Sequence, residues 1–381
     1  MLLLISRRGT WRSTFLSSAT AQTSQSLDLR GLYSDVLYRP FFCANASLAP
    51  FYMHIPSQNT IPQIPDLSQP DFAANWASRP FILTSSVRSW PIYRTWRLEN
   101  LLQDYGSVHF RAESVDWPLS TYVDYMRNNS DESPLYLFDK DFFRKMSLRP
   151  DSYTAPSCFG TDLFAVLGEK RPDHAWLIIG PERGGSTFHK DPNSTSAWNA
   201  VVRGAKYWIM FPPNTTPPGV FVSQDQSEVT SPLSIMEWLL NFHGEARTTL
   251  GCMEGICGEG EVLHVPSGWW HLVINLQETI AVTQNFVPRN HVVKVLDFLR
   301  NQPEQVSGFP KEVDSPYKLF KHNVALIHPE ILEESLENST ILGRRTKRKW
   351  DELVEGEHFA YSDIHENFNF GFSYGIDEEI P

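Results

Sequence analysis

The chain has 381 residues, a length that suits one large domain or two small ones, and 41% of them are hydrophobic, which is ordinary for a protein with a buried core. A net charge of −11 argues against a general nucleic-acid binder and is compatible with a basic peptide substrate, although solubility alone also explains it. No stretch is long and apolar enough to span a membrane, and 12 tryptophans with 27 prolines favour a loop-rich β architecture over a helical bundle.

The N-terminal part changes character twice. Residues 1–26 are rich in serine and threonine with few large apolar side chains, and they predict a disordered N-terminus. Residues 27–75 mix aromatic residues with prolines and predict an extended arm around a domain that begins at residue 76. Within that domain, residues 79–83 predict a strand, and residues 120–126 predict a short helix with Ser120 as its N-cap.

The centre of the chain, up to residue 290, is rich in short strands. Residues 198–202 and 205–211 predict a hairpin across Arg203-Gly204. Ser231-Pro232 predicts the start of a helix through Asn241, with serine as N-cap and proline at the first helical position. Many short antiparallel strands separated by turns predict a double-sheet jelly roll with flanking helices. The other predicted strands cover residues 174–179, 261–265, 269–275 and 279–286.

The C-terminal part is predicted to be helical and then polar. Within residues 291–340, one helix is expected at 291–301 with Asn290 as its cap, and a second at 329–336. Residues 341–381 contain a basic patch, Arg344 to Lys349, followed by an acidic, aromatic tail. The patch is typical of a nuclear-localisation signal and equally of a solvated loop.

Two short motifs supply a metal-ligand set. His189-Lys190-Asp191 and Gly268-Trp269-Trp270-His271 offer two histidines and one carboxylate, the facial triad of non-haem Fe(II) oxygenases. Residues i and i+2 of a strand face the same side, so His189 and Asp191 can reach one ion while Lys190 points away. An antiparallel neighbouring strand can bring His271 to the same ion. The alternatives are a barrel without its metal, or structural zinc, although structural zinc sites are usually cysteine-rich.

The sequence around these motifs resembles a known family. Phe188 to Pro192 is followed by Thr195-Ser196-Ala197-Trp198-Asn199-Ala200, and His271 is followed by Asn275-Leu276 and Thr283-Gln284-Asn285-Phe286. This pattern resembles the Jumonji-C (JmjC) oxygenases, which have a cupin-like double-stranded β-helix. Within them it is most similar to the Jumonji domain-containing protein 6 type and the F-box/JmjC proteins. The resemblance covers roughly residues 76–310, the size of one domain.

The resemblance implies a binding pocket for the cosubstrate 2-oxoglutarate next to Fe(II). Lys206 would grip the far carboxylate with help from Thr283, and a buried cation there would also balance the charge of the site. Alone, Lys206 would be interpreted as a surface lysine, and the polar matches as ordinary core hydrogen-bonding residues. The further residues that match the family's pocket are Asn199, Asn275, Ser186 (a threonine in the closest relatives), Tyr136 and Trp176.

The expected function is Fe(II)- and 2-oxoglutarate-dependent oxygenation of a protein side chain. The resemblance points to lysyl hydroxylation or to demethylation of methyl-arginine or methyl-lysine, and no residue of the chain decides between them. The expected partner is a basic protein or histone tail, with no sequence-specific nucleic acid and no membrane. A non-enzymatic JmjC scaffold is the competing hypothesis, and the intact triad with Lys206 argues against it.

The sequence says less about the cellular localisation and the oligomeric state. The basic patch predicts a nuclear protein, with the cytoplasm also open, and the Arg-rich, acid-free first 27 residues keep a mitochondrial address as a lesser alternative. Residues 9–16 resemble the segment that follows the F-box in F-box/JmjC proteins, and a shortened form of such a protein is one interpretation. The oligomeric state is left open.

Overall fold

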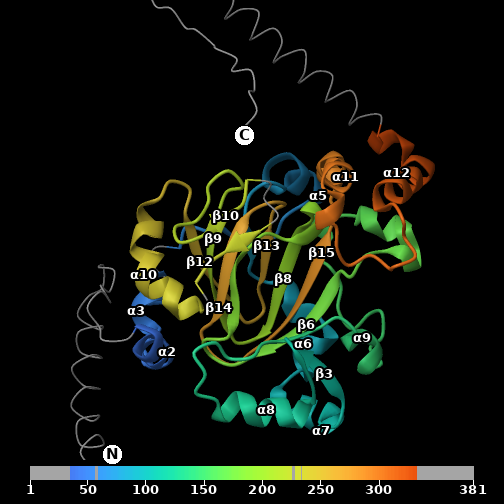
Figure 1. Cartoon of the computed structure of the whole chain (residues 1–381). Helices are drawn as coiled ribbons and strands as arrows, with labels where there is room; N and C mark the ends of the chain where they lie inside the picture. Colours follow the sequence, from blue (N-terminus) through green and yellow to red (C-terminus); the bar gives the residue numbers. More distant parts are fainter. Residues whose placement is uncertain (1–34, 56–58, 225–227, 233, 333–381) are drawn as a thin grey trace, which may run out of the picture. The chain divides into compact units, whose positions relative to one another are not determined.

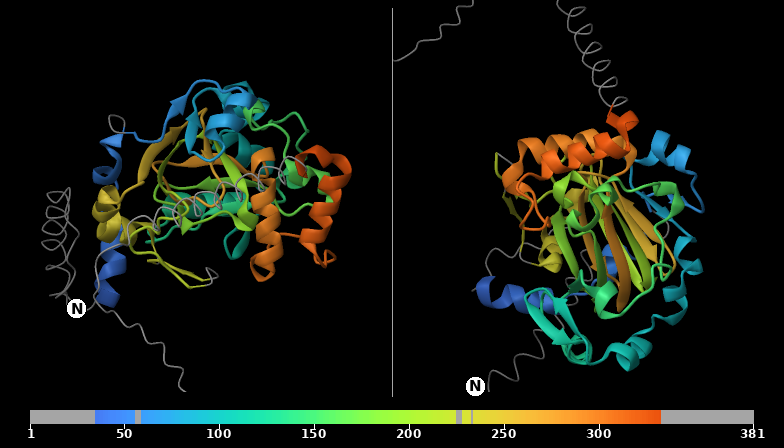
Figure 2. Two further views of the ribbon diagram at one scale, coloured as in Figure 1. Left: turned by 90° about the horizontal axis from the view of Figure 1, so that it is seen from above. Right: turned by 90° about the vertical axis from the view of Figure 1, so that its right-hand side faces the viewer.

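Two β-sheets packed face to face form the centre of the protein (Figures 1 and 2). The computed structural model describes residues 35–55, 59–224, 228–232 and 234–332. The major sheet has nine strands in the order β1-β2-β13-β8-β15-β6-β5-β3-β4, and the minor sheet has four in the order β12-β9-β14-β7. The strands β13-β8-β15-β6 face the minor sheet, so the predicted jelly roll is confirmed.

Most predicted strands agree with the structure to within two residues. Strand β12 was not predicted, because its sequence contains two glycines and a glutamate and therefore gives a weak strand pattern. The major sheet contains β1 (Gln63–Ile64), β2 (Phe81–Leu83), β3 (His109–Ala112), β4 (Val115–Pro118), β5 (Leu137–Asp139), β6 (Ala175–Gly180), β8 (Ser196–Arg203), β13 (Val262–Val265) and β15 (Thr279–Phe286). The minor sheet contains β7 (Gly185–His189), β9 (Ala205–Phe211), β12 (Met253–Gly258) and β14 (Trp270–Asn275), and a separate pair contains β10 (Phe221–Val222) and β11 (Val229–Thr230).

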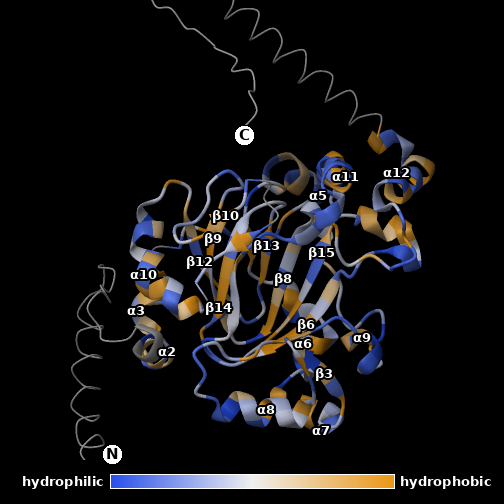
Figure 3. Ribbon diagram, viewed as in Figure 1, coloured by the Kyte–Doolittle hydropathy of each residue, from blue (hydrophilic) through white to orange (hydrophobic). Residues whose placement is uncertain are grey.

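The alternation of side chains along each strand divides the core into an inner and an outer part. Trp208 and Met210 of β9 pack inside the barrel against Val201 and Leu263 of the major sheet. Tyr207, Ile209 and Phe211 point the other way and pack with the helices that cover the minor sheet. The hydrophobic stretches of the strands are visible in Figure 3. Because successive residues of a strand face opposite sides, Lys206 belongs to the inner face.

The predicted hairpin between β8 and β9 is wrong. Both strands exist, but β8 pairs with β13 and β15 in the major sheet, whereas β9 pairs with β12 and β14 in the minor sheet. The chain crosses from one sheet to the other at Gly204, which has a φ of +88°. A short Gly-containing link between two strands predicts a hairpin from local sequence, but a jelly roll uses the same link to change sheets.

Two helices differ from their predictions at the N-cap. Helix α10 runs from Ile235 to Thr248 and is capped by Ser234, whose hydroxyl accepts a hydrogen bond from the Glu237 amide at 3.0 Å. Ser231 is therefore not the cap, and the Ser-x-x-Glu pattern at Ser234 was the better signal. Helix α8 (Leu119–Asn128) begins before Ser120 and has no side-chain cap, and Asn290 donates to the Ala73 carbonyl instead of capping α11 (Val292–Asn301).

The segment before residue 76 is partly helical, so the prediction of an extended arm is wrong for α2 (Asp35–Asn45). Helix α2 lies beside α10 and covers the minor sheet (Figure 1). Helix α12 was not predicted. The remaining helices are α3 (Ala49–Tyr52), α5 (Gln69–Asp71), η1 (Phe72–Trp76), η2 (Ser86–Ser89), α6 (Pro91–Thr95), α7 (Leu98–Tyr105), α9 (Phe142–Lys145), η3 (Ser157–Phe159), η4 (Leu163–Lys170), η5 (Pro192–Ser194), η6 (Arg289–His291), η7 (Pro303–Gln305) and α12 (Pro316–Ile327).

Several sequence predictions fall outside the described residues. They are the disorder of residues 1–26, the basic patch with its acidic tail, and most of the helix at 329–336, of which residues 329–332 are helical. Among the helices of the described residues, none has the length and hydropathy that a membrane crossing requires.

Gly204 tests the crossover between the sheets. A Cβ atom at this position would collide with the carbonyl oxygen of Glu278, and the positive φ disfavours any side chain. We therefore expect Gly204→Ala to lower the free energy of unfolding by about 1–3 kcal/mol. Urea denaturation measures this change. Gly258→Ala is the matched control, because its nearest neighbour would be Glu261 Oε2 at 3.6 Å and its φ is not positive. Equal losses in the two variants would contradict the expected strain.

Candidate metal centre

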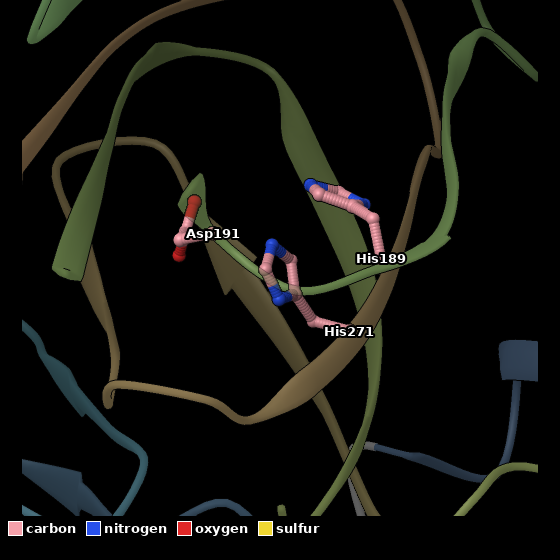
Figure 4. Close-up of side chains that lie close together, drawn as sticks. All are labelled: His189, Asp191 and His271. Atoms are coloured by element: carbon pink, nitrogen blue, oxygen red, sulfur yellow. The ribbon is translucent and has the colours of Figure 1, made fainter. Parts of the chain in front are cut away.

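Three side chains from two strands of the minor sheet converge at one end of the barrel. His189 is the last residue of β7, Asp191 follows two residues later, and His271 lies on β14. One ligand atom from each lies within 4.8 Å of the others, as Figure 4 shows for the three side chains. The sequence prediction that these residues come together is confirmed by this geometry.

Strand pairing explains the convergence. β7 and β14 are antiparallel, and His271 lies directly opposite His189 in their register. The two imidazole rings are 4.1 Å apart, centre to centre. Asp191 lies just beyond the end of β7 but keeps an extended backbone. Lys190 therefore points away, and its ammonium lies 4.6 Å from the centre of the Trp270 ring.

Backbone carbonyls determine which imidazole nitrogen is free to bind. Nδ1 of His189 lies 2.7 Å from the Thr187 carbonyl oxygen, and Nδ1 of His271 lies 3.1 Å from that of Trp269. A carbonyl oxygen only accepts, so each Nδ1 must carry the proton and donate it. The lone pair of each neutral ring is then on Nε2. Such a second hydrogen bond is the usual way in which proteins orient a metal-binding histidine.

Asp191 is held by one oxygen and free at the other. Asn285 of β15 donates from Nδ2 to Asp191 Oδ1 at 3.4 Å and to Thr195 Oγ1 at 3.0 Å. The Oδ2 atom is buried and has no hydrogen-bond partner in the described part of the chain. Burial raises the pKa of Asp191 to about 6, although His189 and the Asn285 hydrogen bond oppose the rise. A buried carboxylate oxygen without a donor is costly unless a cation accompanies it.

These observations fit a divalent metal ion. The free Oδ2 and two Nε2 lone pairs are three donors of the type that bind non-haem iron, and no cysteine joins them. Burial and the neighbouring His189 hold the pKa of His271 well below its ordinary value, so this ring is neutral and available as a ligand. Asn285 was not singled out from the sequence. Its position two residues after Thr283, on the same face of a predicted strand, was the available signal.

A buried lysine lies deeper in the barrel. Lys206 has 0% exposure, and its ammonium donates to the hydroxyl of Tyr136 and, at 3.1 Å, to Asn275 Oδ1. Asn275 is the register partner of Lys206 across β14 and β9. Desolvation lowers the pKa of Lys206 to about 7. No carboxylate forms an ion pair with Lys206 among the described residues, so an anionic ligand would relieve the cost of its burial.

Gly180 makes room for this group. A Cβ atom there would lie 2.6 Å from the Tyr136 ring and 2.7 Å from Asn275 Nδ2. The Asn275 side chain is also fixed by donating to the Pro181 carbonyl at 3.1 Å. The Lys206 neighbours are thus packed against backbone that only glycine supplies.

A polar row on the major sheet carries three more of the residues that the sequence singled out. Thr283 of β15 is the register partner of Trp176 on β6 and of Asn199 on β8. The Thr283 hydroxyl donates to the Trp198 carbonyl at 3.0 Å, and Trp176 stacks on Phe138 with ring centres 5.2 Å apart. Asn199 is buried, and its Oδ1 has no hydrogen-bond partner in the described chain. This orphaned acceptor marks the row as a site for a polar ligand.

Ser186 is brought to the same interior by an irregularity in β7. The register shifts between the pair His271–His189 and the pair Val273–Ser186, which is a β-bulge. Val273 belongs to the inner core, so its partner Ser186 lies on the inner face too. Trp208 was missed by sequence reasoning as a site residue. Its ring lies 6.0 Å from that of His271, and its buried Nε1 has no hydrogen-bond partner among described residues.

A cavity of about 420 Å³ opens beside the triad. His189 is part of its wall, together with Ser186 and Thr187 of β7. The other lining residues are Glu113, Glu132, Ser133, Pro134, Arg183, Gly184, Gly185 and Ile235. A large substrate group can therefore approach the triad from solvent past β7.

Known proteins with similar sequences agree with this geometry. A family model described as a cupin-like domain matches residues 73–291. The "Arginine-specific demethylase JMJ22" of Arabidopsis thaliana is 38% identical over 358 residues, which cover 90% of this chain and 70% of that protein. The "Bifunctional arginine demethylase and lysyl-hydroxylase psr-1" of Caenorhabditis briggsae is 33% identical, covering 73% of this chain and 72% of its own. The "2-oxoglutarate and iron-dependent oxygenase JMJD4" of Homo sapiens is 26% identical over a stretch that covers 64% of this chain and 60% of that protein.

Metal binding tests the geometry of the three ligands and of Asn285. Mn(II) should raise the melting temperature of the wild-type protein, and Asp191→Ala or His271→Ala should abolish the increase. Asn285→Ala should keep metal binding but weaken the affinity about 10- to 100-fold, because it removes the hydrogen bond that orients the carboxylate. Calorimetric titration measures the affinities. Wild-type affinity in Asn285→Ala would show that the hydrogen bond to Asp191 has no orienting role.

Proposed function

This chain belongs to the JmjC oxygenases, and we propose that it acts as an Fe(II)- and 2-oxoglutarate-dependent dioxygenase on a side chain of another protein. The proposal rests on one observation. The same barrel contains three side chains that can ligate a metal and a buried lysine that has no ion-pair partner among the described residues. Arginine and lysine side chains are the substrates that the names of the relatives indicate. The finer choice between hydroxylation and demethylation depends on which carbon is held near the metal.

Three residues can bind the metal ion, and neighbouring groups orient their side chains. Fe(II), when bound by His189, Asp191 and His271, supplies the oxidation of a substrate C–H bond by O2, coupled to conversion of 2-oxoglutarate to succinate and CO2. The carbonyls of Thr187 and Trp269 orient both imidazoles by accepting from Nδ1, which leaves Nε2 for the metal. Asn285 keeps Asp191 Oδ2 directed to the ion. Three protein ligands leave coordination positions open for reactants.

The cosubstrate is held by the interior pocket. Lys206 donates to the far carboxylate of 2-oxoglutarate, and the Tyr136 hydroxyl adjoins that point because it already contacts the Lys206 ammonium. Asn275 Oδ1 accepts a second hydrogen bond from the ammonium. Thr283, which is expected to assist Lys206, lies between Asn199 and Trp176 on the major sheet, and Ser186 lies on the inner face of the minor sheet. The non-enzymatic scaffold is disfavoured, because a scaffold has no use for a buried, unpaired cation.

Two measurements test this function and the pocket together. We expect the wild-type protein with Fe(II), O2 and 2-oxoglutarate to convert the cosubstrate to succinate and CO2. On peptides it should add 16 mass units to a lysine-containing sequence, or release formaldehyde from a sequence with a methylated arginine or lysine. Lys206→Ala should raise the KM for 2-oxoglutarate by about 30-fold or more, since removing one partner of a buried charged contact costs on the order of 2–5 kcal/mol.

Thr283→Val is the matched comparison and should cost less, because its hydroxyl already donates to the Trp198 carbonyl. The wild-type affinity for 2-oxoglutarate should also fall as the pH rises above about 7, because only protonated Lys206 pairs with a carboxylate and its pKa is about 7. Absence of cosubstrate turnover in the wild type would refute the function, and a larger loss in Thr283→Val would refute this assignment of Lys206.

We further propose that the protein is nuclear and that residues 344–349 direct its import. Five basic residues in six lie there, within a chain whose net charge is −11. Replacing the five with alanine should shift a fluorescently tagged protein from nucleus to cytoplasm. The same replacement of the five nearest acidic residues of the tail serves as the control. An unchanged distribution after loss of the basic residues would leave them as a solvated segment.

A further inference from the structure

The cavity beside the triad carries a pair of carboxylates that the chemistry of the metal and cosubstrate does not use. We propose that Glu132 and Glu113 receive the cationic group of the substrate side chain, a guanidinium or an ammonium, as it enters the cavity toward His189. This inference rests on the proposed function for the identity of the ligand. The two glutamates and His189 line the same cavity, so the geometry joins recognition to the reacting centre.

The carboxylate of Glu132 is half-buried and accepts a hydrogen bond from a neutral hydroxyl group. The Ser234 hydroxyl donates to Glu132 Oε1 at 2.6 Å, while the same serine caps α10 by accepting from the Glu237 amide. A hydroxyl anchor fixes the position of a carboxylate without neutralising its charge. The N-terminus of a helix also favours a neighbouring negative charge.

Glu113 is fixed in a similar way on another part of the wall. It lies in the turn between β3 and β4, and its Oε1 accepts a hydrogen bond from the Tyr136 amide at 3.2 Å. The backbone of Tyr136 therefore links Glu113 to the cosubstrate pocket, since the Tyr136 hydroxyl contacts Lys206. Each glutamate is thus held at the cavity wall by a hydrogen bond from a neutral donor.

The arginine that lines the cavity is held by backbone carbonyls. Arg183 also lines the wall, but its two terminal nitrogens donate to the carbonyls of Cys43 and Ala46 at the end of α2. Within the described residues, no lysine or arginine forms an ion pair with Glu113 or Glu132. The wall therefore carries two carboxylates against the one guanidinium of Arg183, whose charge also interacts with Glu132. An entering cationic side chain can offset the remaining negative charge, and a guanidinium is well suited to donate to a carboxylate.

Peptide binding tests this inference without any turnover. The probes are two fluorescein-labelled peptides of glycine, serine and alanine, one with a central arginine and one with its neutral analogue citrulline. They are titrated into the full chain loaded with Mn(II) and 2-oxoglutarate. The wild type should bind the arginine peptide about tenfold more tightly than the citrulline peptide, the scale of a hydrogen bond to a charged group. The difference should shrink at high salt.

Glu132→Gln should remove most of this preference, and Glu113→Gln part of it. Glu245→Gln is the matched control, because Glu245 is exposed on α10, ten residues beyond the cavity residue Ile235 and so about 15 Å along the helix. Melting temperatures identify any variant that fails to fold, and the second glutamate then carries the test. A wild type without preference, or full preference in both cavity variants, would overturn the inference. Absent cosubstrate turnover with this preference intact would instead overturn only the proposed oxygenase.

Discussion

The antiparallel register between β7 and β14 is the constraint on which the site depends. It places His271 opposite His189, while the bulge in β7 lets Ser186 and His189 share the inner face although they are three residues apart. A shift of one residue would send one imidazole to the outer face, where Phe188 and Leu272 now pack under α10. The helices on the minor sheet therefore stabilise the register as well as the core, because the apolar partners of the histidines need that cover.

The barrel interior contains two buried ionisable side chains of opposite charge. Asp191 and Lys206 are both buried, and burial shifts their pKa values toward neutrality in opposite directions, to about 6 and about 7. Each group has neutral hydrogen-bond partners rather than an ion pair: Asn285 donates to Asp191, and Lys206 donates to Tyr136 and Asn275. The site therefore contains two buried ionisable groups, and neither has an ion-pair partner among the described residues. Such sites cost folding free energy, and the ligands that complete them return it as binding free energy.

The sequence predicted those features that depend on local pattern combined with a specific motif. The strands at 261–265, 269–275 and 279–286 and the convergence of His189, Asp191 and His271 follow from alternation and spacing. The partner of β9 did not follow, because Gly204 permits both a hairpin and a change of sheet, and only long-range packing decides. The cap at Ser234 was identifiable from Ser-x-x-Glu. The roles of Asn285, Glu113 and Glu132 were not, since each depends on residues distant in sequence.

The charged side chains of the site differ in sign between the outer cavity and the barrel interior. The outer cavity presents two carboxylates and one arginine, the metal position presents one carboxylate with two imidazoles, and the interior presents the ammonium of Lys206. A cationic side chain is attracted to the first of these and repelled by the last, whereas a dianionic oxo acid is attracted to the last and repelled by the first. With the proposed ligands, opposite signs at the two ends would keep substrate and cosubstrate from exchanging places, and the three metal-ligating residues adjoin the outer cavity through His189.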